Sequence, residues 1–343
     1  MTSATQAQRY HADPAVSQIA DMLGDAVHAA AFPRHVLRWR NDRAAAQTGL
    51  DALTDAAWID HFGRFQPLPD NLQQPLALRY HGHQFGTYNP DLGDGRGFLF
   101  AQMRDDVGRL IDLGTKGSGQ TPYSRFGDGR LTLKGAVREL LATEMLEALG
   151  VETSRTFSII ETGEALQRGD EPSPTRSAVL VRMSHGHIRV GSFQRLAYLE
   201  DAAGLERLTR YALRNYAGRE DADELPVAEA ATALVAHTVQ VTARLAASYM
   251  VAGFVHGVLN TDNINISGES FDYGPWRFTP QWKPGFVAAY FDSGGLYAFG
   301  RQPQAIQWDA GQLAVSLRAL ADSEPLIAAM EGMDFDTPKG KMT

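Results

Sequence analysis

The stretch His256-Gly257-Val258-Leu259-Asn260-Thr261-Asp262-Asn263, with Asp272-Tyr273-Gly274 shortly after it, decides the fold expected for this chain. It follows a long run, 227–250, that is rich in Ala and predicts a helix. Loops after such elements often carry chemistry. Amide and carboxylate oxygens from Asn263 and Asp272 suit a hard cation that also binds phosphates, so Mg²⁺ is expected, with Mn²⁺ as a substitute. The simpler alternative is an Asn/Asp-rich turn between short strands.

The same stretch follows the protein-kinase pattern His-Arg-Asp-x-x-x-x-Asn, then Asp-Phe-Gly. His256, Asn263 and Asp272 match the histidine and the two metal ligands, and His256 is expected to pack under the loop. Val258 stands where kinases keep their catalytic aspartate, so the usual base for phosphate transfer is missing. Asp262 is the nearby carboxylate that could accept the proton of an attacking hydroxyl. The pattern therefore favours attack at a phosphorus other than the γ-phosphorus.

A second group of residues lies earlier in the chain. Gly93-Asp94-Gly95-Arg96 precedes a predicted hairpin, and closely spaced glycines let backbone amides approach phosphates. Lys116 ends the following strand, and Glu139 lies on the next predicted helix, where it can pair with the lysine. The polar, Gly-rich segment 117–130 between them is expected to contact ligand. The alternatives are an ordinary hairpin turn, a surface lysine and a solvated glutamate.

Two arginines complete the candidate residues. Arg182 and Arg189 flank the segment 183–188. Both are expected on a small N-terminal β-sheet, where this sheet faces a cleft between two lobes. A guanidinium offers two parallel donors to phosphate oxygens, although each could also be a surface ion-pair residue.

The remaining pattern gives the architecture. Strands are predicted at 97–102, 109–113, 156–160 and 177–183, with an amphipathic helix at 132–149 and further helices at 205–216 and 227–250. The expected class is α+β, with an N-terminal mixed β-sheet lobe that carries one key helix and a mostly helical C-terminal lobe. We expect a helical and loop extension at 1–75, the nucleotide-binding lobe at 76–190 and the lobe with the catalytic loop at 191–343.

Composition narrows the functional classes. The chain has 343 residues, 44% of them hydrophobic and 21% charged, which is typical of a globular enzyme. Forty acidic against 32 basic residues give a net charge of −8, so nucleic acid is not an expected partner. There is no Cys, which excludes disulfides, thiolate metal sites and a catalytic thiol. The N-terminal stretch 1–16 lacks a signal-peptide core and no run is long enough to span a membrane, so a cytoplasmic protein without membrane contact is expected.

Taken together, these motifs resemble the selenoprotein O family (SelO, also called YdiU), kinase-like proteins understood as protein adenylyltransferases. The motifs that carry the resemblance lie between Tyr80 and Trp308 and are Tyr80-His81-Gly82-His83-Gln84-Phe85-Gly86, Leu92-Gly93-Asp94-Gly95-Arg96, Lys116-Gly117, Thr121-Pro122-Tyr123-Ser124-Arg125-Phe126, Asp128-Gly129-Arg130, Arg138-Glu139, the 256–263 stretch, Asp272-Tyr273-Gly274-Pro275 and Gln302-Pro303. The resemblance implies a bilobal protein-kinase-like fold. It also implies that ATP binds in a flipped orientation, so that AMP is transferred to Ser, Thr or Tyr hydroxyls of protein substrates.

The resemblance also implies roles for individual residues. Asp262 would accept the proton, Asn263 and Asp272 would hold the metal, and Glu139 would support Lys116. The residues expected to contact the nucleotide are Gly93, Gly95, Arg96, Lys116, Asp128, Gly129, Arg182, Arg189 and Asp272.

This sequence departs from the family in two respects. Family members continue beyond the point where this chain stops, some with a near-terminal Cys or selenocysteine that bears on redox control, whereas this chain has no Cys. The segment 291–297 matches its family counterpart only loosely. Transfer of another nucleotide such as UMP, a nucleotide-binding scaffold without catalysis and a γ-phosphate kinase are the alternatives to AMP transfer, and Val258 argues against the kinase.

Overall fold

The computed structural model describes residues 10–331, which form two compact units. The first comprises 10–78, 93–141 and 154–187 and is called here the β-rich unit; the second comprises 79–92, 142–153 and 188–331 and is called the helical unit. The expectation about a signal peptide rests partly on 1–9, which lie outside the described residues, as do 332–343.

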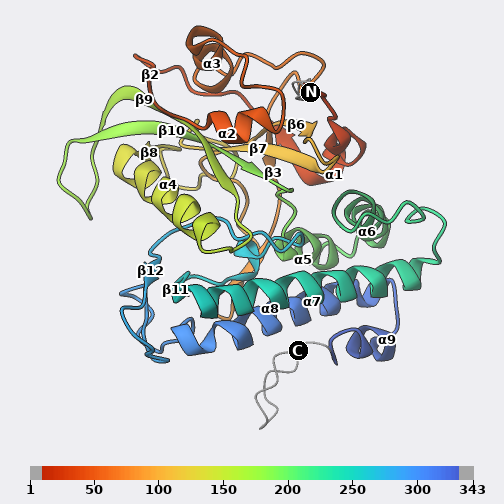
Figure 1. Cartoon of the computed structure of the whole chain (residues 1–343). Coiled ribbons are helices and arrows are strands. Elements are labelled where there is room, and N and C mark those ends of the chain that lie inside the picture. The colour runs from red at the N-terminus through yellow and green to blue at the C-terminus, as the bar shows by residue number, and fades with distance from the viewer. Residues whose placement is uncertain (1–9, 332–343) are drawn as a thin grey trace, which may run out of the picture. The chain divides into compact units, whose positions relative to one another are not determined.

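An antiparallel sheet forms the centre of the β-rich unit (Figure 1). Its strands follow the order β1-β3-β6-β7-β10-β9-β2, and β8 pairs with β10. The strands are β1 (Gly24–Ala26), β2 (Val36–Arg40), β3 (Leu76–Leu78), β6 (Leu99–Arg104), β7 (Leu110–Lys116), β8 (Leu131–Thr132), β9 (Arg155–Leu166) and β10 (Thr175–Ser184). The four strands predicted from the sequence correspond to β6, β7, β9 and β10, so those predictions are confirmed.

Aromatic packing builds the core on one face of this sheet. Trp58 is fully buried, its ring stacks on Phe157 with centroids 4.8 Å apart, and its indole nitrogen donates to Ser158 Oγ at 2.8 Å. Phe98 and Phe100 of the β6 region belong to the same hydrophobic cluster. Burial of rings of this size is a main source of stability in a domain core.

The first 75 residues contribute strands to this sheet in addition to the helices and loops expected there. Strand β1 pairs with β3 and β2 pairs with β9, both antiparallel. The helical elements of this segment are η1 (Ala15–Gln18), α1 (Ala20–Leu23), α2 (Asp42–Ala46) and α3 (Asp55–Phe62).

Helix α4 (Leu133–Ala148) confirms the predicted amphipathic helix, but its buried face differs from the one that apolar spacing indicated. Ala136, Glu139 and Leu146 are buried, whereas the apolar Leu141 and Met145 are 50% and 43% exposed. The reason is that Glu139 has a cationic partner inside the unit, so a charged residue can occupy the inner face.

The helical unit contains the rest of the chain. Its elements are β4 (Gly82–Gln84), β5 (Thr87–Asn89), α5 (Val190–Tyr198), α6 (Ala202–Tyr216), α7 (Val227–Ala252), β11 (Phe254–Val255), η2 (Thr261–Asn263), β12 (Arg277–Phe278), η3 (Phe299–Arg301), α8 (Gln302–Ser316), η4 (Leu317–Ala319) and α9 (Ser323–Ala328). Helices α7 and α8 contact one another along their lengths (Figure 1), and α5 packs on α8. The predicted helices 205–216 and 227–250 are confirmed as α6 and α7.

The predicted loop follows shortly after the last turn of α7. Gly253 caps the helix at a φ of +65°, a left-handed conformation that glycine adopts without strain. Strand β11 follows at once and pairs with β12, so residues 256–276 form a loop closed by a short two-stranded ladder.

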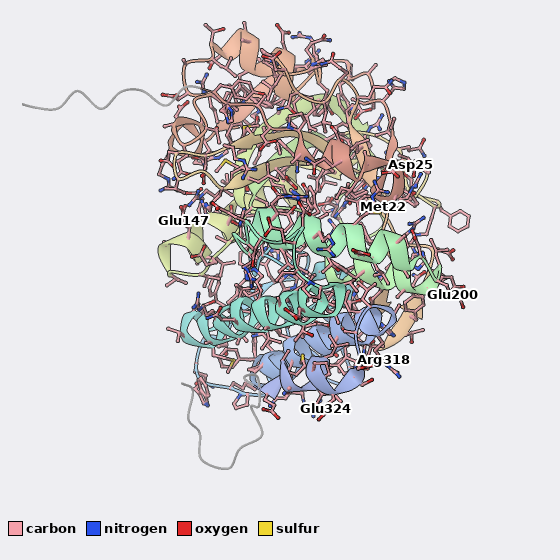
Figure 2. The ribbon with its side chains drawn as sticks, turned by 90° about the vertical axis from the view of Figure 1, so that its right-hand side faces the viewer. Met22, Asp25, Glu147, Glu200, Arg318 and Glu324 are labelled. Atoms are coloured by element: carbon pink, nitrogen blue, oxygen red, sulfur yellow. The ribbon has the colours of Figure 1, made fainter. Side chains whose placement is uncertain are left out.

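Charged side chains lie at the surface of the helical unit. Figure 2 shows Glu200, Arg318 and Glu324 there, and all three are exposed. Among the described helices, none combines the length and the apolar character that crossing a bilayer requires.

Candidate functional site

Lys116 and Glu139 form a buried ion pair in the β-rich unit. Lys116 is the last residue of β7, and its Nζ lies 2.5 Å from Glu139 Oε2 on α4. Both side chains are almost inaccessible to solvent, at 8% and 3% exposure. Such a pair holds the ammonium group in one place, because a buried charge that loses its partner is strongly destabilising. The pairing expected from the sequence is therefore present.

Arg182 extends this pair into a buried network. Its Nη1 lies 3.9 Å from Glu139 Oε1, and its Nε donates to His187 Nε2 at 2.9 Å. Because His187 Nε2 accepts this bond, its other nitrogen carries the proton and faces Asp112 Oδ2 at 3.2 Å. Gly114 makes room for the imidazole, since a Cβ there would lie 2.4 Å from His187 Nε2. The network holds the guanidinium of Arg182 beside the Lys116–Glu139 pair.

The glycines of the 93–97 loop are required by close packing within the same unit. A Cβ on Gly93 would lie 2.3 Å from Tyr123 Cγ, one on Gly95 would lie 2.8 Å from the Tyr123 carbonyl oxygen, and one on Gly97 would lie 1.9 Å from the Thr115 carbonyl oxygen. The hydroxyl of Tyr123 in turn donates to Asp25 of β1, labelled in Figure 2. Packing thus explains these glycines, and contact with phosphate stays a prediction.

Asp128 and Gly129 lie in the segment that follows. Asp128 is exposed and accepts from Arg168 Nη1 at 2.8 Å and from the Arg130 amide at 2.9 Å. Partial burial, the largest single effect, raises the pKa of Asp128, but the hydrogen bonds from Arg168 and the Arg130 amide and the charges of both arginines together outweigh it, so the pKa is lowered. Gly129 has a φ of +69° and packs on the backbone of Gly119. The Arg96 side chain is exposed and has no ion-pair partner within the described part of the chain.

In the helical unit, buried polar side chains form hydrogen bonds that hold the start of the 256–263 loop. His256 is fully buried, and its Nε2 donates to the Phe271 carbonyl at 3.0 Å, as expected for a packing histidine. Gln302, the first residue of α8, accepts from the His256 amide at 3.0 Å and donates to the Phe254 carbonyl at 2.7 Å. These bonds tie Phe254 and His256, where the loop begins, to one helix.

The β4–β5 hairpin holds the middle of the loop. Thr261 Oγ1 accepts from the His83 amide at 2.7 Å and donates to Gln194 Oε1 at 2.6 Å. Asn260 Oδ1 accepts from the Phe85 amide at 3.1 Å and from the Tyr297 hydroxyl at 2.7 Å. The two residues before Asp262 are thus bound by side-chain hydrogen bonds to the hairpin and to the helical core.

Asp262 itself lies against two glycines. A Cβ on Gly82 would lie 3.0 Å from Asp262 Oδ1, and one on Gly191 would lie 3.6 Å from Asp262 Cα and 2.2 Å from the His81 carbonyl oxygen. The His81 amide also donates to the Gly191 carbonyl at 3.1 Å. The loop at Asp262 is thus packed closely against the backbone of β4 and of α5.

Asn263 and Asp272 provide the oxygens predicted to hold a metal. Asn263 Nδ2 donates to the Val258 carbonyl at 2.9 Å, which orients the amide and leaves Oδ1 as an acceptor. Asp272 has a φ of +61° and lies with Oδ2 3.5 Å from Arg189 Nη2. The two oxygens fit a cation that takes its other ligands from phosphates and water. Within 10–331 no group of three or more His, Asp or Glu side chains could hold a metal by itself.

Arg189 is buried more deeply than the sequence indicated. It immediately precedes α5 rather than lying in the sheet, is 1% exposed, and its guanidinium carbon lies 4.0 Å from the centroid of the Tyr80 ring and 5.1 Å from that of Phe271. Arg182 therefore belongs to the β-rich unit and Arg189 to the helical unit. Cation–π contacts of this kind stabilise a buried guanidinium.

Several residues that shape this loop escaped sequence reasoning. The sequence pattern assigns no role to Gly82, Gly191, Gln194 or Tyr297, although Gly82 lies in a motif of the resemblance and Tyr297 ends the loosely matching segment 291–297. Asp309 of α8 was also missed: it is fully buried and neither carboxylate oxygen has a hydrogen-bond partner among the described residues. Burial, followed by the charge of Asp262, raises the pKa of Asp309 well above its ordinary value. Its isolated position in a helix gave no signal.

A strand lysine paired with a helix glutamate, followed in the chain by a loop that carries Asp262 and Asn263 and then by Asp272, defines a protein-kinase-like α+β protein. The family model described as "Protein adenylyltransferase SelO" matches residues 6–338. The chain therefore belongs to the SelO family, as the resemblance predicted.

Relatives named "Protein nucleotidyltransferase YdiU" support this assignment. The protein from Synechocystis sp. is 49% identical over 93% of this chain and 66% of its own length. The one from Synechococcus elongatus is 51% identical over 93% and 64%, and the one from Vibrio cholerae is 39% identical over 87% and 60%. This chain thus spans less than two thirds of the length of these three relatives.

One solved structure is also similar. A Toxoplasma gondii virulence factor, described as having a protein-kinase fold and no enzymatic activity, aligns with a TM-score of 0.32 and 12% identity, over 76% of this chain and 75% of that one.

Proposed function

We propose that this protein transfers AMP from ATP to Ser, Thr or Tyr hydroxyls of other proteins, with Mg²⁺ as the metal. The observation that carries the proposal is the position of Asp262. It lies in a loop held by side-chain hydrogen bonds, directly before Asn263, while Val258 occupies the place of the kinase base. Family membership supports nucleotidyl transfer as the class of reaction.

In the proposed step, the acceptor hydroxyl oxygen attacks the α-phosphorus of ATP. The bond between that phosphorus and the bridging oxygen breaks, and pyrophosphate leaves. The hydroxyl proton passes to an Asp262 carboxylate oxygen. A metal bound to Asn263 and Asp272 would supply charge neutralisation for the phosphates.

The cationic residues have a complementary role in this proposal. Lys116 and Arg182 would neutralise phosphate oxygens, and Glu139 keeps both in place through contacts of 2.5 and 3.9 Å. Arg189 is assigned the same role beside Asp272. Fixed charges of this kind stabilise a transition state without reorganising during the reaction. Gly93, Gly95, Arg96, Asp128 and Gly129 are proposed as nucleotide contacts on the basis of the resemblance alone.

The test is the intact mass of the protein, and of an added mixture of acceptor proteins, after incubation with ATP and Mg²⁺ or Mn²⁺. We expect an AMP-sized adduct, reduced by about 10²-fold or more in Asp262→Asn because a positioned general base contributes at least that much. Asp272→Asn should also abolish it. Asp106→Asn, which alters an exposed turn carboxylate, is the matched control and should react like the wild type.

The alternatives give different results in the same experiment. A phosphate-sized adduct would identify a kinase, and a UMP-sized adduct formed preferentially from an ATP/UTP mixture would identify uridylyl transfer. ATP binding in a calorimeter without any adduct would identify a nucleotide-binding scaffold. UMP transfer stays open because none of the proposed nucleotide contacts reads the base.

A further inference from the structure

A pocket of about 600 Å³ lies in the helical unit, and neither Asp262 nor Asp272 is part of its lining. Its walls include Leu259 of the 256–263 loop, Tyr297, and Ala305 and Trp308 of α8, and Gly86 of the hairpin turn lies at its edge. This volume lies within the range of protein cavities that bind compact groups. Its walls are mainly apolar, which does not suit a triphosphate.

Exposed aromatic side chains lie in the wall of this pocket and next to its lining residues. Phe85, Phe291 and Trp308 are 37%, 49% and 44% exposed. The centroid of the Phe85 ring lies 5.7 Å from that of Phe291 and 5.0 Å from that of Tyr297. A cluster of exposed rings around a hollow is unusual for a surface that contacts only water. Such surfaces are typical of sites that bind another protein.

Arg301 gives the pocket its charge. Among the lining residues within 10–331, it is the only charged one. Its Nη1 donates to the carbonyls of Gly294 and Gly295 at 3.0 and 3.1 Å, and no described carboxylate forms an ion pair with it. The positive charge is therefore available to an acidic group next to whatever fills the pocket.

The pocket is continuous with the loop that carries the proposed base. Leu259 belongs to both, and the Tyr297 hydroxyl in the pocket wall donates to Asn260, two residues before Asp262. A chain segment seated in the pocket would therefore lie against the same loop that carries Asp262.

We propose that this pocket binds the acceptor protein through a large apolar side chain that is flanked by an acidic residue and is near the modified hydroxyl. The inference rests on the proposed function, which requires a protein hydroxyl to reach Asp262. The apolar walls favour the apolar side chain and Arg301 favours its acidic neighbour. Because Leu259 of the pocket wall and Asp262 belong to one loop, the occupant is an acceptor rather than an unrelated partner.

Peptide selection tests the inference without relying on catalysis. A peptide mixture with one fixed central Tyr or Thr and randomised flanks is passed over the immobilised protein, and retained peptides are sequenced by mass spectrometry. We expect enrichment of Phe, Trp, Leu or Met at one position, with Asp or Glu beside it, by about 5-fold or more over the starting mixture.

Variants of the pocket sharpen this test. Ala305→Glu introduces a carboxylate into the wall and should abolish the apolar enrichment. Arg301→Glu should change the preferred neighbour from Asp or Glu to Lys or Arg, which loss of folding would not do. Val315→Glu, at a 57% exposed position of the same helix outside the pocket, is the matched control and should select like the wild type.

The outcomes separate this inference from the proposed function. Retained peptides with no apolar preference, or a preference unchanged in Ala305→Glu, would overturn the inference. So would a protein that selects no peptide and instead forms a dimer lost in Ala305→Glu. If selection occurs as expected but ATP yields no adduct on the selected peptides, the pocket stands and the transfer reaction does not.

Discussion

At the scale of single residues, the position of the proposed base, Asp262, depends on two neighbouring residues that lack a Cβ atom. Gly82 and Gly191 have no Cβ, and this lets the backbone of the hairpin and of α5 approach Asp262 closely. Gly82 carries no positive φ, so an alanine there meets no backbone strain. Its added methyl group would act through contact alone.

Gly82→Ala is therefore expected to disturb the base selectively. The new Cβ would lie 3.0 Å from Asp262 Oδ1 and 3.2 Å from Leu92 Cδ1, so the carboxylate must move by a few tenths of an ångström. We expect the rate of adduct formation to fall by roughly 10- to 100-fold, because small misplacements are costly in catalysis. Single-turnover kinetics would measure this rate, and calorimetry would measure the affinity for ATP. Gly285→Ala, with open space around the new Cβ, is the control, and equal rates in both variants would contradict this account.

His81 makes stability depend on pH. Burial, followed by the charge of Arg195, lowers the pKa of His81 to about 4, while Asp91 opposes the shift. The unfolded imidazole, with a pKa near 6.5, binds more protons than the folded one between these values. The neutral folded form thus contributes its full stability above about pH 6.5. That contribution is lost as pH falls toward 4.

We expect the urea midpoint to fall between pH 7 and pH 4.5, and to fall less steeply in His81→Gln. The glutamine can keep a hydrogen bond to the Tyr88 hydroxyl, which lies 2.7 Å from His81 Nδ1, but it does not titrate. Denaturation curves at several pH values measure the slope. A slope that is the same in both proteins would show that His81 is not the group responsible.

The residues that sequence reasoning found share one property. Lys116, Glu139 and Asn263 are chemically distinctive and occur in a recognisable order, so their pattern alone predicted the buried pair and the loop. Gly82, Gly191 and Gln302 could not be given roles, because their functions depend on backbone approach between segments far apart in the chain. No local pattern encodes such an approach.

At the scale of elements, hydrophobic pattern predicted the presence of the long segments, although not the buried face of α4, and it did not predict the short strands. Strand β10 is buried along most of its length, and its apolar run 178–181 predicts such a strand. Strand β7 is buried throughout although it contains Asp112 and Lys116. Strand β1 has three residues and exists because Asp25 pairs with Ala77 of β3. Its partner is distant in sequence, so tertiary pairing rather than propensity creates it.

Helix α8 offers a direct test of helix energetics. Gly311 lies in its interior, and a Cβ added there would meet nothing within 4 Å, so Gly311→Ala should gain helix propensity without a clash. We expect a stabilisation of about 0.5–1 kcal/mol from urea denaturation. Gly268→Ala should destabilise, because Gly268 has a φ of +79° and the new Cβ would lie 2.6 Å from Val241 Cβ. Destabilisation by Gly311→Ala would contradict the assignment of a regular, open helix face.

At the scale of the whole molecule, a net charge of −8 opposes the binding of an anionic nucleotide. The proposed function assigns the compensating positive charge to buried cations, which are Lys116 and Arg182 in the β-rich unit and Arg189 in the helical unit. Phosphate affinity is therefore expected to be a property of these positions, not of the general surface.

ATP with Mg²⁺ should raise the thermal midpoint. A ligand at 100 times its Kd stabilises the native state by about 2.7 kcal/mol, which corresponds to a rise of several degrees in a protein of this size. Differential scanning fluorimetry with and without nucleotide measures the rise. Lys116→Gln should remove most of it, and an unchanged midpoint in wild-type protein at millimolar ATP would contradict nucleotide binding.

Gln302 links the start of the 256–263 loop to the helix that lines the apolar pocket. Its side-chain amide is bonded to both Phe254 and His256, and the same helix supplies Ala305 and Trp308 to the apolar pocket. A molecule that shifts α8 on entering the pocket is therefore expected to shift the start of the 256–263 loop as well. Thermodynamic linkage makes such coupling reciprocal, so an acceptor that tightens nucleotide binding is itself bound more tightly, by the same factor, when nucleotide is present.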